Sequence, residues 1–326
     1  MRSFSKRGFA SIGSLDSLIL CQDLSHEDLA TTKLVKTQGQ KRKYYTLKSY
    51  SKTALVLKRR VYNVRNEKDI LLEVRHPFVV KLLRTFNDAA NVYLLLEYLP
   101  GGELFTFVRN NSCLPNDVAL FYGAEIVLAL AHLHSLDVAY RNLRPEHVLL
   151  TKHGHIKLID FSSAKRIRGE ERSNTNCGAL AYMAPEVISG LGHTKAVDWW
   201  AFGVLLYEML VGLPPFYDED PQKLYAKILT SSVTFPRHIE ETAQDLISSL
   251  LQINPTTRLG SHNPEEVTEH LWFDGVDFDM VLRKEIDPPW IPVLKRQGDT
   301  SYYPVATEAA AEGESAPLAV DPLADF

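Results

Sequence analysis

Four polar residues that could serve in metal binding or proton transfer lie in two largely apolar stretches. The stretch YRNLRPEHVLL contains Asn142, Arg144 and His147, and the stretch LIDFSSAK contains Asp160. A carboxylate such as Asp160 offers the hard oxygen ligands that Mg²⁺ prefers, whereas an imidazole suits softer metals. An amide such as Asn142 can orient a hydroxyl group but has no useful basicity. These residue types predict one carboxylate ligand for a cation, and at position 142 a group that can orient a hydroxyl but cannot take its proton.

A zinc site at His147 is an alternative interpretation of this histidine, and the sequence does not favour it. No cysteine or second histidine lies at a suitable local spacing from His147, and Cys21, Cys113 and Cys177 are too few and too scattered for a zinc site or a disulfide framework. We therefore expect a hydrogen-bonding histidine. The cysteine usage also predicts a reducing compartment, namely the cytoplasm, with the nucleus as a second location.

The elements that must position these residues form an α+β pattern. YYTLKSYS alternates as a strand does, and VYNVRNEKDILLEV has the apolar spacing of a short helix. After the turn in LPGGELF, VALFYGAEIVLALAHLHSL and VDWWAFGVLLYEMLVGL carry apolar stripes with helical period. We predict a small β-rich lobe with one main helix at about 24–98 and a larger, mostly helical lobe at about 102–273. Residues 1–23 read as a flexible extension, and the last part of the chain reads as disordered.

Composition and charge restrict the class of protein. The chain has 326 residues, of which 45% are hydrophobic, so it can bury a large core. Its formal net charge of -4 argues against a nucleic-acid partner bound through bulk charge. No apolar run reaches the roughly 18 residues that a membrane span needs, and residue 2 is Arg instead of the Gly required for N-myristoylation. We therefore expect neither nucleic acid nor a membrane among its partners.

A series of motifs in register resembles the protein kinases, and most of all the AGC-group catalytic subunits of cAMP-dependent protein kinase. The motifs are LLEYLPGGELF, YRNLRPEHVLL, LIDFSSAK, CGALAYMAPE, VDWWAFGVLLYEM and NPTTRLG. The resemblance runs from about residue 24 to about 303, and PPWIPVLKRQGDTSYY is similar to the family's C-terminal tail, which wraps the small lobe. The last four residues, LADF, are similar to the family's terminal hydrophobic motif, which implies a segment tucked into the small lobe; the alternative is a frayed end. It implies a bilobal protein-kinase fold, with the kinase domain at 24–273 and an AGC-type tail at 274–326.

The resemblance implies a site for ATP and Mg²⁺. Lys48 matches the lysine that holds the phosphates, and Glu67, nineteen residues later, matches the helix glutamate that orients it. Further positions that match the family's nucleotide site are Glu97, Leu99 and Leu149. Asp160 matches a metal ligand, and His147 replaces the asparagine that supplies a second metal ligand. Glu186 and Arg258 match a buried ion pair of the large lobe, which is structural.

Several catalytic features of the family are replaced. The segment LSHEDLATTKLVK contains no glycine, although the family uses a glycine-rich loop to bring backbone amides to the phosphates. Asn142 replaces the catalytic aspartate, and Arg144 replaces a lysine. Losing such a base costs about 10²–10⁴ in rate. These changes favour a pseudokinase with impaired phosphoryl transfer, with weak or no nucleotide binding, and with a regulatory, scaffold or decoy role. The alternative is an active serine/threonine kinase that transfers the γ-phosphate of ATP.

The resemblance also implies protein partners. Glu103 and Glu146 match carboxylates that hold arginines of basic peptide substrates or pseudosubstrates, although solvated surface acids are the simpler interpretation. A kinase regulatory subunit is a further partner that the resemblance suggests. Arg141 and Thr175 match the family's activation-loop arginine and phosphosite, and a phosphate on Thr175 would find a partner in Arg141. The alternative is a loop threonine that satisfies local hydrogen bonds.

Overall fold

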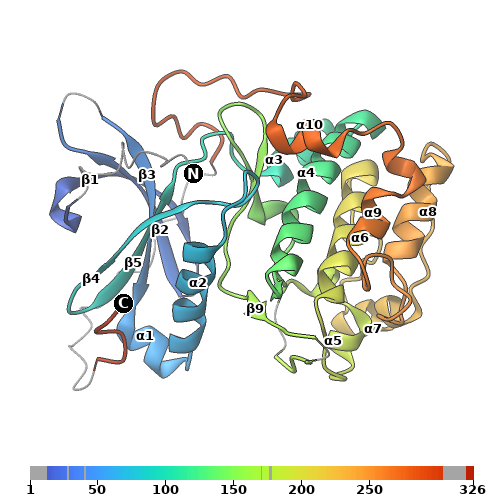
Figure 1. Ribbon diagram of the computed structural model, residues 1–326, viewed down its shortest axis with the longest axis horizontal. Helices are drawn as coiled ribbons and strands as arrows, with labels where there is room; N and C mark the ends of the chain where they lie inside the picture. Colours follow the sequence, from blue (N-terminus) through green and yellow to red (C-terminus); the bar gives the residue numbers. More distant parts are fainter. Residues whose placement is uncertain (1–12, 28, 40–41, 170, 176–177, 304–320) are drawn as a thin grey trace, which may run out of the picture. The chain divides into compact units, whose positions relative to one another are not determined.

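The computed structural model describes residues 13–27, 29–39, 42–169, 171–175, 178–303 and 321–326. Its contacts divide the chain into two compact units (Figure 1). Unit 1 comprises residues 1–68, 81–100 and 294–326, and unit 2 comprises residues 69–80 and 101–293. The α+β kinase fold that the sequence predicts is confirmed, with an antiparallel sheet in unit 1 and a mainly helical unit 2.

Unit 1 is built on a five-stranded antiparallel sheet with the order β1-β2-β3-β5-β4. Its strands are β1 Leu18–His26, β2 Ala30–Thr37, β3 Tyr44–Ser51, β4 Leu82–Asn87 and β5 Asn91–Glu97, and its helices are η1 Leu15–Ser17, α1 Lys52–Leu57 and α2 Val61–Glu73. The boundary between the units falls within α2. Val35, Leu47 and Leu95 form a buried cluster under the sheet. The predicted strand at YYTLKSYS and the predicted helix at VYNVRNEKDILLEV both form.

Two predicted boundaries at the ends of unit 1 are wrong. Strand β1 begins at Leu18, inside the predicted extension 1–23, because Leu15 and Leu18 pack against the buried cluster of the sheet. At the other end, the prediction of disorder is wrong for residues 321–326, which pack against unit 1 as the tucked-in alternative for this segment requires. Leu323 is fully buried, Lys52 Nζ lies 2.5 Å from Asp321 Oδ2, and Asn87 Nδ2 donates to the Leu323 carbonyl at 2.7 Å. Residues 1–12 and 304–320 of the two predicted segments lie outside the described residues.

Unit 2 consists mainly of helices packed around α4 and α6, which run side by side (Figure 1). Its helices are α3 Leu104–Asn111, α4 Asn116–Ser135, η2 Pro145–His147, η3 Leu180–Tyr182, α5 Pro185–Ile188, α6 Ala196–Val211, α7 Pro221–Thr230, α8 Glu241–Leu250, α9 Glu265–Thr268, η4 Leu271–Phe273 and α10 Phe278–Arg283. Its strands form two short pairs, β6 Val138–Ala139 with β9 Lys165–Arg166, and β7 Val148–Leu150 with β8 Ile156–Leu158. α4 is long and apolar enough to cross a membrane by length and composition, but most of it is buried within the protein, which is typical of a core helix.

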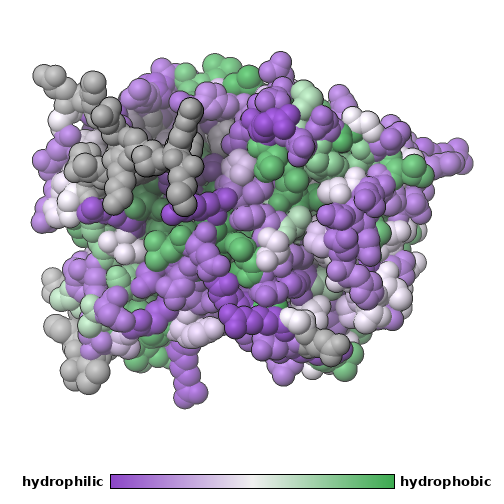
Figure 2. Space-filling model, in the orientation of Figure 1, coloured by the Kyte–Doolittle hydropathy of each residue, from purple (hydrophilic) through white to green (hydrophobic). Residues whose placement is uncertain are grey.

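The limits of unit 2 also differ from the predicted lobes. Residues 69–80, predicted to belong to the small lobe, group with unit 2 because Val80 N donates to the Leu158 carbonyl and Leu158 N donates to the Phe78 carbonyl, both at 2.9 Å. Residues 274–293, predicted as tail, also belong to unit 2, since α10 packs against α4. The surface in view is largely hydrophilic, with smaller hydrophobic areas between the polar ones (Figure 2).

Candidate functional site

Unit 1 contains a buried ion pair between Lys48 on β3 and Glu67 on α2. Lys48 Nζ lies 3.3 Å from Glu67 Oε1, and the Tyr50 hydroxyl donates to Glu67 Oε2 at 2.5 Å. Both charged side chains are almost fully buried, at 4% and 1% exposure. A buried glutamate with two donors is held in one orientation, and it fixes the lysine in turn. The two side chains that the nineteen-residue spacing linked are therefore brought together.

The hairpin that stands where the family has its glycine-rich loop is closed by side-chain contacts. Asp23 on β1 lies 3.6 Å from Lys33 Nζ on β2 and 3.5 Å from His26 Nε2. The Thr31 hydroxyl on β2 lies 2.5 Å from the Ser49 hydroxyl on β3, which ties the hairpin to the next strand. Glycine would allow backbone amides to approach a phosphate closely, whereas every residue of LSHEDLATTKLVK carries a Cβ. The segment therefore lacks the open backbone surface that a phosphate cradle requires.

The segment from Glu97 to Leu99 is held by backbone and side-chain hydrogen bonds and by a ring contact with the C-terminal tail. Glu97 Oε1 accepts a hydrogen bond from Lys81 N at 2.8 Å, and the Leu99 carbonyl accepts one from the Tyr303 hydroxyl at 2.8 Å. The rings of Tyr98 and Tyr303 stack with centroids 6.0 Å apart. Both interactions lie within unit 1. Leu149, which the sequence placed at the nucleotide site together with Glu97 and Leu99, is a buried residue of β7 in unit 2.

Asp198 at the start of α6 holds the YRNLRPEH stretch in place. This fully buried carboxylate accepts hydrogen bonds from Tyr140 N at 2.8 Å and Arg141 N at 2.7 Å, and it lies 2.8 Å from His134 Nε2. Arg141 has a φ of +60°, a region that non-glycine residues seldom adopt. The two backbone bonds to Asp198 stabilise this turn, which places Asn142 and the residues after it.

The side chain of Asn142 is bound to Asp160. Its Nδ2 donates to Asp160 Oδ2 at 2.7 Å and to the Asp160 carbonyl at 3.1 Å. Asp160 has a φ of +50°, whereas Ser162 does not adopt a positive φ. The sequence predicted both residues as site residues but gave no reason to expect a direct bond between them. One oxygen of the carboxylate at the family's metal-ligand position therefore already accepts a hydrogen bond from the amide.

The side chain of Arg144 is bound to His147. Arg144 Nη2 and Nε lie 3.0 Å and 3.2 Å from His147 Nε2, and His147 Nδ1 lies 2.8 Å from the Asn142 carbonyl. Because a guanidinium only donates and a carbonyl only accepts, Nδ1 carries the proton and Nε2 accepts. The imidazole is therefore neutral, and both of its nitrogens are engaged within the loop.

These contacts do not fit the pair of Mg²⁺ ions that the family implies. His147 offers nitrogen instead of oxygen, and Arg144 brings a positive charge to that nitrogen. Asp160 Oδ2, which lies 3.7 Å from His147 Nε2, already accepts from Asn142. A metal ligand should present free lone pairs toward a cation, and here a donor or a cation takes that position. Among the described residues no group of three histidines, cysteines or carboxylates could hold a metal ion.

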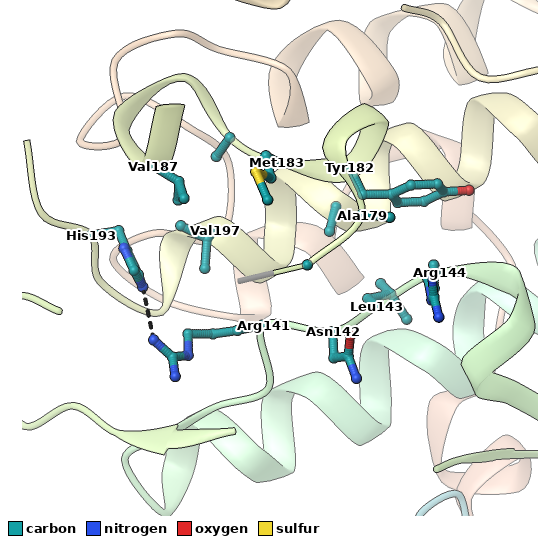
Figure 3. Close-up of a pocket in the computed structure, with 13 residues that line it drawn as sticks. Arg141, Asn142, Leu143, Arg144, Ala179, Tyr182, Met183, Val187, His193 and Val197 are labelled. Atoms are coloured by element: carbon teal, nitrogen blue, oxygen red, sulfur yellow. Dashed lines mark hydrogen bonds between the residues drawn. The ribbon is translucent and has the colours of Figure 1, made fainter. Parts of the chain in front are cut away.

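Arg141 and the activation segment form a basic cluster around Ser173. The buried Ser173 hydroxyl accepts from Arg141 Nη1 at 3.0 Å and from Lys165 Nζ at 3.2 Å. Arg141 Nη1 also lies 3.2 Å from His193 Nε2 (Figure 3). Burial, with the charge of Arg141, lowers the pKa of His193 to about 4, so this imidazole is neutral and accepts from Arg141. Thr175, the predicted phosphosite, is exposed.

Three carboxylates lie along the helical part of unit 2, and the sequence identified two of them. Burial and the neighbouring Glu146 raise the pKa of Glu103, whereas Arg144 lowers it. The third carboxylate is Glu208 on α6, which is buried and accepts a hydrogen bond from the Tyr182 hydroxyl. Burial raises the pKa of Glu208 as well, with a further contribution from Glu146. An acidic residue in the apolar run GVLLYEMLVGL was the signal that could have revealed it.

A small hollow of about 30 Å³ lies beside these residues in unit 2. The hollow is lined by residues 141–144 and by residues 178, 179, 182–184, 187, 193, 197 and 201. Figure 3 shows Met183, Val187 and Val197 on one side of it and the Arg141–Arg144 stretch on the other. Most of these side chains are apolar, so the hollow suits an apolar side chain next to a polar rim.

The predicted buried ion pair of unit 2 also forms. Arg258 Nη1 and Nη2 donate to the two carboxylate oxygens of Glu186 at 2.7 Å and 2.9 Å. Arg258 further donates to the carbonyls of Ala196 and Gln252 and stacks over the ring of Trp200 at 5.2 Å. A bidentate pair with these additional contacts compensates for the desolvation of both charges.

Comparison with known proteins identifies the family. Residues 30–273 match the family described as protein kinase domain. The chain is 43% identical over 270 residues to the mouse (Mus musculus) cAMP-dependent protein kinase catalytic subunit PRKX, covering 82% of this chain and 76% of the relative. It is also 44% identical over 263 residues to the Drosophila melanogaster cAMP-dependent protein kinase catalytic subunit 3, covering 80% of this chain and 45% of the relative. The chain therefore belongs to the protein kinase family and is similar to the catalytic subunits of cAMP-dependent protein kinase.

Proposed function

We propose that this chain is a pseudokinase: a protein kinase domain with impaired phosphoryl transfer that acts as a regulatory, scaffold or decoy protein in kinase signalling. The observation that carries this proposal is the bond from Asn142 Nδ2 to Asp160 Oδ2 at 2.7 Å. It joins the residue at the position of the catalytic base to the residue at the position of the metal ligand. An amide cannot take the proton of an attacking hydroxyl, and the carboxylate that it binds is less available to Mg²⁺.

The contacts of Arg144 and His147 support the same proposal. Protein kinases take phosphate from ATP with Mg²⁺, and positive groups must neutralise the charge of the transferred phosphoryl group. Here the Arg144 guanidinium binds His147 Nε2 instead of presenting all its donors to a phosphate. Together with the glycine-free hairpin, this arrangement supports weak or no binding of Mg-ATP. Framework pairs such as Glu186 with Arg258 stabilise the fold and do not depend on turnover.

We further propose that the domain binds basic protein segments, as substrate mimics or as parts of a kinase regulatory subunit. The support is the group of carboxylates Glu103, Glu146 and Glu208, together with the apolar hollow beside them. The raised pKa values of Glu103 and Glu208 mean that these two carboxylates are incompletely compensated, so an arginine of a ligand would gain charge-assisted hydrogen bonds there. We place this function in the cytoplasm, with the nucleus as a second compartment.

The second candidate function is an active serine/threonine kinase. The intact Lys48–Glu67 pair and the surviving Asp160 favour it, because both belong to the apparatus that positions ATP. In that case Asn142 orients the hydroxyl and turnover depends on Asp160.

The test is phosphate transfer from labelled ATP to a basic serine peptide by the native chain, Asn142→Asp and Asp160→Ala. We expect the native chain and Asp160→Ala to give the same background signal. Robust transfer by the native chain that disappears in Asp160→Ala would establish the active kinase and overturn the pseudokinase.

Peptide binding is measured separately by fluorescence anisotropy. Glu208→Gln should weaken binding of the basic peptide about 10- to 100-fold, from the loss of one charge-assisted hydrogen bond. Glu269→Gln is the matched control, since Glu269 is exposed and directly follows α9. Equal binding by the native chain and Glu208→Gln would refute the assignment of this carboxylate.

A further inference from the structure

The corner between α1 and α2 carries consecutive exposed cations on an unusual backbone. Lys58, Arg59 and Arg60 connect the two helices, and Arg60 N donates to the Leu55 carbonyl at 2.7 Å. Arg59 has a φ of +55°, in the left-handed region where glycine is favoured and other residues are strained. An arginine is thus present where the backbone prefers glycine. Such an outlier motivates a search for a role of the side chain.

Exposed apolar side chains flank these cations. Leu57 at the end of α1 is 77% exposed, Tyr62 in the first turn of α2 is 67% exposed, and Val56 is 39% exposed. Single exposed apolar residues are common, but several of them beside exposed cations form a surface typical of an interaction site. We call Val56, Leu57, Arg59, Arg60 and Tyr62 the basic–apolar corner.

The neighbouring surface of unit 1 already binds an acidic and apolar sequence, which is the chain's own segment Asp321–Phe326. Lys52 pairs with Asp321 at 2.5 Å, and Arg65 Nη1 donates to Asp325 Oδ2 at 3.0 Å. Between these acids, Leu323 is fully buried. In Figure 1 this segment ends beside α1 and β4. The α1–α2 surface therefore recognises carboxylates that alternate with apolar side chains.

The basic–apolar corner continues this surface but lacks such a ligand. Tyr62 lies three residues before Arg65 on α2, and residues at this spacing share one face of a helix. Arg59 and Arg60 have no carboxylate partner within the part of the chain that the structure describes. Lys52 and Arg65 are neutralised by carboxylates of the tail segment, whereas Arg59 and Arg60 at the corner have no such partner among the described residues. Charge complementarity thus points to a second acidic ligand.

We propose that the basic–apolar corner is a docking site for an acidic segment of a partner protein. Aspartate or glutamate side chains of that segment pair with Arg59 and Arg60, and a bulky apolar side chain packs between Leu57 and Tyr62. The chemistry repeats that of Asp321–Phe326 on the adjoining surface. This docking does not depend on phosphoryl transfer, so it holds for a pseudokinase and for an active kinase alike.

The test is a fluorescence anisotropy titration of the full chain with a short labelled peptide of the repeated unit Glu-Leu-Asp-Phe. The variant Arg59→Gly/Arg60→Ala should weaken binding at least about tenfold, because two charge-assisted contacts are lost. Added salt should weaken binding by the native chain, since exposed charges are screened. Arg59→Gly removes the strained φ, so this variant should unfold at the same temperature as the native chain or higher. Loss of binding therefore cannot be attributed to unfolding.

The matched control is Arg42→Ala/Lys43→Ala, which removes two exposed cations from the same unit. These residues precede β3, and α1 follows it, so a strand of about 25 Å separates them from the corner. The control variant should bind the peptide within about twofold of the native chain. Equal binding by the corner variant and the native chain would overturn the proposal. The proposal would also be overturned if the native chain bound phosphatidylserine vesicles or duplex DNA more tightly than the peptide and the corner variant abolished that binding.

Discussion

Replacing Asn142 by aspartate tests the central contact of the candidate site. In the native chain Asn142 Nδ2 donates to Asp160 Oδ2 at 2.7 Å, and Asn142→Asp places a second carboxylate at this position. The change removes a hydrogen bond to a charged acceptor, about 1.5–3 kcal/mol. It also adds repulsion of up to about 4 kcal/mol for two charges about 4 Å apart near a protein surface. Because the side chains can rotate apart, we expect a net loss of about 2–4 kcal/mol in the free energy of unfolding.

The assay is urea unfolding of the native chain, Asn142→Asp and Asn142→Ala at neutral pH with EDTA present. Asn142→Ala removes the donor without adding charge, so the difference between the two variants isolates the repulsion. Mg²⁺ should restore stability to Asn142→Asp and have little effect on the native chain, because two carboxylates provide the hard oxygen ligands that Mg²⁺ prefers. If Asn142→Asp were as stable as the native chain in EDTA, the Asn142–Asp160 bond would not exist and the reasoning would fail.

Three further predictions concern the framework, the activation segment and the tail. Glu186→Gln should lower the free energy of unfolding by about 3–5 kcal/mol, measured in urea, because it leaves the buried charge of Arg258 uncompensated; a loss below about 1 kcal/mol would contradict a buried pair. His193 has a folded pKa of about 4, which is below its unfolded value of about 6.5. Its neutral form therefore contributes to stability above about pH 6.5, and this contribution is lost as the pH falls toward 4. The total loss is about 3 kcal/mol. His193→Asn should flatten this part of the curve of stability against pH, and an unchanged curve would refute the assignment. Leu323→Ala should destabilise unit 1 by about 2–5 kcal/mol, seen as faster hydrogen exchange in its sheet, and no change there would mean that Leu323 is not buried.

The sequence predicted those parts of the site that depend on spacing between regular elements. Lys48 and Glu67 meet because a strand and the following helix fix their positions, and Glu186 meets Arg258 within the helical unit. The fold class followed from periodicity and from the ordered series of motifs. These features survive changes of individual side chains, since they rest on buried apolar faces.

The remaining contacts depend on side-chain rotation and on neighbours distant in sequence. The Asn142 amide donates to Asp160, and the Arg144 guanidinium donates to His147. These groups come within reach of one another only when the loop is folded. No local pattern specifies these choices, because an amide or a guanidinium has several acceptors within reach. The roles of Leu15 and Leu18 were missed for a related reason, as their packing partners come from three other strands of the sheet.

The composition of unit 1 from three separate segments has a consequence for its synthesis. Lys52 is made long before its partner Asp321, which follows 269 residues later. At the usual rate of translation of about 5–20 residues per second, the lysine waits roughly 15–50 s for this carboxylate. All segments of unit 2 are synthesised during that interval. The sheet of unit 1, whose strands lie between residues 18 and 97, is therefore synthesised early, but its tail-binding side chains stay without their partners until every segment of unit 2 has been made.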